Sequence, residues 1–148
     1  MAKQPGEEIP VKIRIKTTVS NENGRETFEL ATFGRYCIKG RTRYLLYEEV
    51  WDVGKVRSVV KITADEIVIL RRGPVEMNMK FQRNKELAGR YKTPYGILDI
   101  ATCTKELAHS CGEEERKGSV RIQYDLKMQG ALAGTYDLQL QFEEERQK

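Results

Sequence analysis

The chain has 148 residues, of which 39% are apolar and 32% are charged, and its net charge is +4 at pH 7. This length suits one domain with its own hydrophobic core, and the apolar content excludes an intrinsically disordered chain. The N-terminal segment lacks the apolar run of a signal peptide, and the longest apolar runs, such as 67–70, are far too short to span a bilayer. We therefore expect a cytoplasmic protein with a single domain over residues 1–148, whose polar tails at 1–8 and 143–148 are flexible.

Alternation of apolar and polar residues with a period of two predicts strands along almost the whole chain. The first strand covers 11–19, where apolar residues alternate with Lys12, Arg14 and Lys16. A turn at Asn23-Gly24 leads into a second strand at 28–38, in which Gly34 indicates a bend at a barrel corner. Four further strands are predicted, each bounded by a Gly, Pro or Asp turn, at 44–50, 56–62, 67–72 and 75–82.

The second half of the chain continues this pattern. A strand is predicted around Tyr91, followed by a proline turn at 93–96 and a strand at 97–107. A short helical turn at 105–109 is the one helix that the sequence indicates. A charged loop at 112–117 then precedes two closing strands at 120–128 and 135–142.

These segments amount to about eight to ten strands with short connections, so strands that follow one another should pair as antiparallel hairpins. A meander of this size removes its exposed edges by closing on itself. The predicted fold is therefore an all-β, closed antiparallel up-and-down barrel.

Short motifs along these strands occur in a distinctive order, which no single motif would establish. They are Tyr44–Glu49 (YLLYEE), Val59–Ile62 (VVKI), Ile69–Gly73 (ILRRG), Met77–Phe81 (MNMKF) and Tyr91–Gly96 (YKTPYG). From about Val11 to Phe142 the series resembles the YwiB-like family of small uncharacterised bacterial β-barrel proteins. The resemblance implies a lipocalin-like (calycin-type) barrel in a cytoplasmic bacterial protein and brings no known activity, catalytic residue or cofactor. The charged segment at 113–116 matches no motif of that family.

Polar side chains at strand positions indicate where a site could lie. Tyr47 and Glu49 share one face of a strand, Arg71 ends another strand, and Lys61 lies on the strand between. We expect Arg71 to point into the barrel mouth and pair with Glu49, with Tyr47, Lys61 and Tyr91 nearby. Such a cluster would bind a small molecule that is partly anionic. The alternative is a structural ion pair on the outer face or at the barrel end, which is common in folds without a ligand there.

Residues typical of catalytic or metal sites are sparse. Cys37, Cys103 and Cys111 are expected to be reduced thiols, because nothing indicates export. Cys103, His109 and Cys111 lie close in sequence, but without a Cys-x-x-Cys pair or a second histidine they are expected to be ordinary loop residues. No nucleophile-elbow or phosphate-loop motif occurs, so we expect neither an enzyme nor a bound cofactor or metal.

The leading functional prediction is a non-enzymatic barrel that binds a small, partly anionic or amphiphilic ligand in its lumen. The alternative is a module that binds RNA or protein through a basic outer surface around Lys12, Arg14 and Lys16, with Tyr36 and Tyr44 as candidates for stacking. A net charge of +4 is small for a dedicated nucleic-acid binder, so this alternative ranks second. A ligand barrel should contain a connected cavity, whereas an interaction module should have a filled interior.

Overall fold

The computed structural model describes residues 8–112 and 116–145 and contains ten strands within them. The strands are β1 (Glu8–Asn21), β2 (Gly24–Lys39), β3 (Thr42–Trp51), β4 (Gly54–Ile62), β5 (Ile67–Arg72), β6 (Glu76–Phe81), β7 (Glu86–Thr93), β8 (Gly96–Gly112), β9 (Lys117–Met128) and β10 (Ala131–Glu144).

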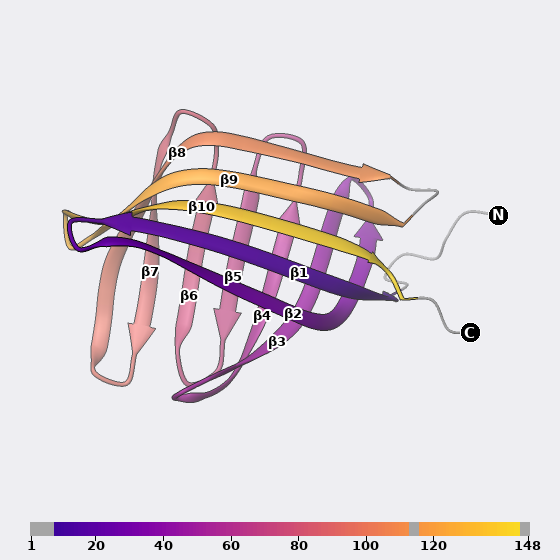
Figure 1. Cartoon of the computed structure of the whole chain (residues 1–148), viewed down its shortest axis with the longest axis horizontal. Coiled ribbons are helices and arrows are strands. Elements are labelled where there is room, and N and C mark those ends of the chain that lie inside the picture. The colour runs from indigo at the N-terminus through magenta and orange to yellow at the C-terminus, as the bar shows by residue number, and fades with distance from the viewer. Residues whose placement is uncertain (1–7, 113–115, 146–148) are drawn as a thin grey trace.

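The strands form one closed antiparallel barrel (Figure 1). Each strand pairs with its neighbours in sequence, and β1 pairs with β10 from Val11–Glu144 to Ser20–Thr135 to close the ring. The predicted up-and-down barrel is thus confirmed. No helix among the described residues is long and apolar enough to cross a membrane.

Two walls face each other across the interior (Figure 1). The long strands β1, β8, β9 and β10 form one wall together with the first half of β2, and the shorter strands β3 to β7 form the other. Strand β2 joins both walls, because residues 24–33 pair only with β1 whereas Gly34 to Lys39 pair with β3. Gly34 lies at this junction, where a Cβ atom would come 2.8 Å from Ile13 Cδ1 and still closer to the Leu46 carbonyl oxygen.

The predicted helical turn at 105–109 is wrong, because these residues continue strand β8. A β-bulge shifts the register between Thr104 and Glu106, so Lys105 and Glu106 are both exposed between buried Thr104 and Leu107. The extra residue breaks the period of two and leaves two buried positions three residues apart. That spacing imitates one turn of an amphipathic helix.

The interior is filled with large side chains from both walls. The largest that are fully buried include Phe81, Ile13, Leu45, Ile62, Ile67, Ile69, Ile122 and Leu140. The Phe81 ring packs edge-on against Tyr124, with ring centroids 4.6 Å apart. This continuous cluster supplies the hydrophobic stabilisation of the barrel.

The barrel strands extend slightly into the tails that were expected to be flexible. Glu8 already belongs to β1, and Glu143 and Glu144 belong to β10 although they were expected in a flexible tail. The Glu145 N–H also donates a hydrogen bond to the Pro10 carbonyl at 2.9 Å. The other predicted tail residues, and the charged residues 113–115, lie outside the described residues.

Candidate functional site

A row of inward-facing side chains crosses strands β3 to β8. Residues that pair directly on neighbouring antiparallel strands point to the same face of the sheet. The pairing places six residues in one such row: Tyr47, Ser58, Arg71, Met77, Tyr91 and Leu98. The row lies beside the β5–β6 turn, so it lines the barrel mouth that this turn borders, which we call the Arg71 mouth (Figure 1).

Arg71 is the only cation of this row, and its guanidinium is incompletely satisfied. Its side chain is 16% exposed, and its Nε lies 3.8 Å from Glu49 Oε2, which is too long for a hydrogen bond. Nη1 donates to Met77 Sδ at 3.4 Å, a weak acceptor, and Cζ lies 5.8 Å from the centre of the Trp51 ring. The buried Nε–H has no hydrogen-bond partner among the described residues.

Glu49 supplies the negative charge of the mouth. It lies two residues after Tyr47 on β3, so both side chains point inward, and the Glu49 side chain is 19% exposed. The Ser58 hydroxyl donates to Glu49 Oε2 at 3.4 Å. The carboxylate therefore balances the charge of Arg71 without occupying its donors.

Three tyrosines surround Arg71 from both walls. Burial raises the pKa of Tyr47, Tyr124 and Tyr136, and the positive charge of Arg71 opposes this rise in each case. The Tyr124 and Tyr136 rings come from β9 and β10 and stack with centroids 5.1 Å apart. Arg71 thus faces neutral phenol groups from the opposite wall of the barrel.

The structure brings together four of the five predicted site residues. Arg71, Glu49, Tyr47 and Tyr91 lie on the inner face, and the expected Arg71–Glu49 pair is present. The placement of Lys61 in this group is wrong: it pairs with Tyr44 and Val68 on the outer face, between buried Val60 and Ile62.

Sequence reasoning missed four residues of the Arg71 mouth. Ser58 could have been found, because it shares the period-two face of Val56 and Val60 on β4. Trp51 shares the face of Tyr47 and Glu49 on β3 and could have been found in the same way. Tyr124 and Tyr136 reach Arg71 from across the barrel, and no local pattern in the sequence indicates that approach.

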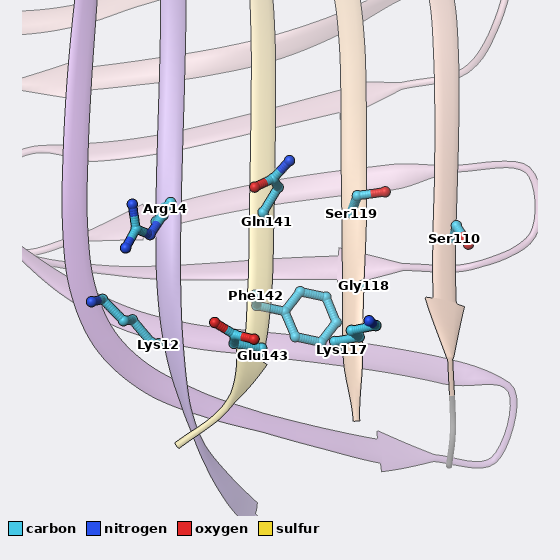
Figure 2. A pocket seen from close by; sticks show the side chains of 9 residues that line it. All are labelled: Lys12, Arg14, Ser110, Lys117, Gly118, Ser119, Gln141, Phe142 and Glu143. Carbon is cyan, nitrogen blue, oxygen red and sulfur yellow. The ribbon is translucent and has the colours of Figure 1, made fainter. Parts of the chain in front are cut away.

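The predicted basic stripe of β1 lies on the outer face. Figure 2 shows Arg14, Gln141, Ser119 and Ser110 in one row across four strands, beside a hollow of about 390 Å³. Lys12, Glu143 and Lys117 form the next row, so the hollow carries charge of both signs. Its floor is close-packed, because a Cβ at Gly118 would lie 2.7 Å from the Phe142 ring.

The aromatic residues proposed to stack beside this stripe do not lie on it together. Tyr36 is 2% exposed and packs against Phe142 inside the barrel, so it cannot stack on a nucleic-acid base. Tyr44 lies on the outer wall of β3, where the Lys39 ammonium approaches its ring centroid at 5.6 Å.

A second outer groove is more strongly basic than the β1 stripe. It has a volume of about 530 Å³ and lies over β5 to β8. Arg71 and Met77 also border this groove. Its outer surface carries four cations and one acidic residue, and none of the four cations forms an ion pair with a described residue: Arg72, Lys80, Arg90 and Lys92, with Glu76. We call this surface the β5–β8 groove.

The residues considered for metal binding do not form a ligand set, and the expectation that they are loop residues is wrong, because all three belong to strand β8. No cluster of three potential ligands occurs within residues 8–112 and 116–145. His109 Nε2 lies 3.2 Å from the Ala64 carbonyl oxygen, and Cys103 donates to Glu86 Oε1 at 3.0 Å. Cys37, Cys103 and Cys111 are free thiols in the structure.

The fold and the site together define a closed ten-stranded antiparallel barrel with a packed interior and a polar mouth. Residues 13–140 match the family described as "Domain of unknown function (DUF1934)", and the chain belongs to this family. It is 33% identical over 120 residues to the "Uncharacterized beta-barrel protein YwiB" of Bacillus subtilis (strain 168), covering 81% of this chain and 83% of that protein. The crystal structure of the ywiB protein from Bacillus subtilis is similar, with a TM-score of 0.85 and 29% identity over 94% of each chain. The resemblance found in the ordered motifs is thus confirmed.

Proposed function

We propose that this protein binds a small ligand with an anionic group and an apolar part, held at the Arg71 mouth. The proposal assigns binding and no chemical reaction. The anionic group would be a carboxylate or phosphate, because a guanidinium matches the geometry of both with paired hydrogen bonds.

The unsatisfied guanidinium of Arg71 carries this proposal. A largely buried polar group without hydrogen bonds is costly, and such a group in a native structure calls for an explanation. Arg71 has a weak sulfur acceptor, a hydrogen bond with the Tyr47 hydroxyl and a carboxylate at 3.8 Å, but its buried Nε–H has no partner among the described residues. An incoming oxyanion would supply the missing acceptors, and nearby phenol groups could donate to it as well.

The surroundings of Arg71 fit an apolar part of the same ligand. Met77, Tyr91 and Tyr136 are partly buried and pack against the hydrophobic core. All three offer accessible apolar surface, and the two tyrosines add polar hydroxyl tips, a combination that small-molecule sites commonly have.

The filled interior is what we expected of an interaction module and not of a barrel with a ligand cavity, so the structure does not support binding deep in the lumen and the proposed ligand is confined to the mouth. Beyond Arg71 on β5, Ile69 and Ile67 are almost fully buried, and Phe81 fills the space beside them. The ligand would therefore bind at the end of the barrel, whereas a calycin-type barrel would enclose it deep in the lumen.

Native mass spectrometry of protein purified without denaturation tests this proposal. We expect a bound mass on the wild type and on Arg72→Met, but not on Arg71→Met. Arg72 is a matched control because it follows Arg71 directly and points to the outer face. A bound mass that Arg71→Met retains, or its absence from the wild type, would contradict the proposal.

The β5–β8 groove supports a second candidate function, the binding of a polyanion such as RNA. Its four outward-facing cations, none of which is ion-paired with a described residue, create a positive surface that attracts phosphates through a salt-dependent interaction. Retention on a phosphocellulose column should then fall steeply with salt, and Arg72→Met combined with Arg90→Met should elute earlier than wild type. The same double variant should still carry the bound mass expected at the Arg71 mouth, which separates this candidate from the first.

A further inference from the structure

One stretch of the barrel has a strand edge that no described residue pairs with. Residues 24–33 of β2 pair with β1 on one side, whereas β3 begins to pair only at Gly34. Eight of these ten residues are exposed, including Phe28 and Phe33 at 57% and 61%. A long exposed edge of this kind is a template for another strand, which native proteins usually cover or block.

The register shows which backbone groups point outward along this edge. The Pro10 carbonyl bonds to the Glu145 N–H, so even-numbered residues of β1 direct their backbone groups to β10. Odd-numbered residues of β1 therefore bond to β2, where their partners are even-numbered. The backbone N–H and C=O groups of odd-numbered residues, from Arg25 to Phe33, consequently face the open edge.

We propose that this edge pairs with the same segment of a second copy of the chain, antiparallel and centred on Thr27. A second copy offers the same pattern of outward-facing groups, so odd-numbered residues would have to pair with odd-numbered residues. Centring on Thr27 places Arg25 opposite Glu29 of the second copy, and Glu29 opposite its Arg25. Opposite charges directly across a strand pair are stabilising, as are Thr–Thr pairs.

The other face of the strand supports the same register. Phe28 would lie diagonally across from Phe28 of the second copy, within reach of an aromatic contact. The neighbouring registers are less complementary: centring on Phe28 leaves Arg25 opposite Ala31, and centring on Glu29 sets two carboxylates against each other. Charge complementarity therefore selects a symmetric, isologous dimer with one continuous sheet across both barrels.

Charge reversal at the two positions tests this dimer by sedimentation velocity at increasing protein concentration. We expect the wild type to dimerise, and Arg25→Glu and Glu29→Arg each to weaken dimerisation about tenfold, because two attractive pairs become repulsive. The double variant Arg25→Glu/Glu29→Arg should recover the dimer. A mixture of the two single variants should form a heterodimer, because every pair across the edge is then attractive.

Arg41→Glu is the matched control, since it makes the same charge change in the exposed β2–β3 turn, outside the open edge. It should dimerise like wild type, and unchanged circular dichroism should show that all variants fold. A monomeric wild type would overturn the proposal, even if the edge then pairs with a strand of a different protein. A wild-type dimer that resists both single reversals would also overturn it, because pairing would then not use this register.

Discussion

Replacing Arg71 with methionine perturbs the polar mouth at its centre. At 3.8 Å and an effective dielectric constant of about 20, two opposite charges attract by about 4 kcal/mol. The side chains of Arg71 and Glu49 are 16% and 19% exposed, so solvent screening and desolvation remove part of this energy. Methionine keeps much of the buried stem of arginine. We therefore expect a loss of about 2 kcal/mol, between the values typical of exposed and of fully buried pairs.

Urea unfolding at neutral pH measures this loss, and Glu49 provides the decisive comparison. In Arg71→Met the Glu49 carboxylate keeps the Ser58 hydroxyl as a hydrogen-bond donor at 3.4 Å and lacks a compensating charge. The double variant Arg71→Met/Glu49→Gln removes that charge and should be more stable than Arg71→Met alone. A loss below about 0.5 kcal/mol in Arg71→Met, or strictly additive effects in the double variant, would refute the reasoning.

Three further predictions concern the barrel itself. Gly34→Ala should destabilise the fold by about 1–3 kcal/mol in urea melts, because its Cβ would meet backbone and core atoms at the strand junction; equal or higher stability would contradict this. Phe81→Ala should cost about 3–5 kcal/mol in the same assay, whereas Phe28→Ala, at 57% exposure, should cost under about 0.5 kcal/mol if the chain is measured as a monomer. Burial raises the pKa of Tyr36 from 10.0 to about 12 and also raises that of Tyr124, so their contribution to stability is complete below about pH 10 and is lost as pH rises towards the folded-state values. Tyrosinate absorbance should therefore show Tyr36 and Tyr124 ionising at the same pH at which circular dichroism shows the barrel unfolding. Ionisation of both tyrosines near pH 10 in a barrel that stays folded would contradict this.

Much of the architecture could be predicted because the barrel is built from local rules. Period-two alternation located the strands, and short polar turns between them required neighbouring strands to pair. The same rule placed Arg71 correctly, since it shares its face with Ile67 and Ile69. The same period of two could also have placed Lys61 on the outer face, because its neighbours Val60 and Ile62 occupy the buried face.

What could not be predicted depends on contacts without a local signature. The approach of Tyr124 to Arg71 spans the barrel, and it is set by the tilt of the strands and by how the two walls face each other. The bulge after Thr104 changes the phase of β8 by one residue, which a periodic pattern cannot anticipate. The open edge at 24–33 likewise follows from where β3 leaves β2, at Gly34.

The fluorescence of Trp51 offers the most direct test of ligand binding at the Arg71 mouth. It is the single tryptophan of the chain, and its ring centre lies 5.8 Å from Arg71 Cζ. Titration with hexyl phosphate should give a saturable change in Trp51 emission, which neutral hexanol should not reproduce and which Arg71→Met should abolish. An emission that does not respond to hexyl phosphate, or an identical saturable response in Arg71→Met, would contradict the proposed site.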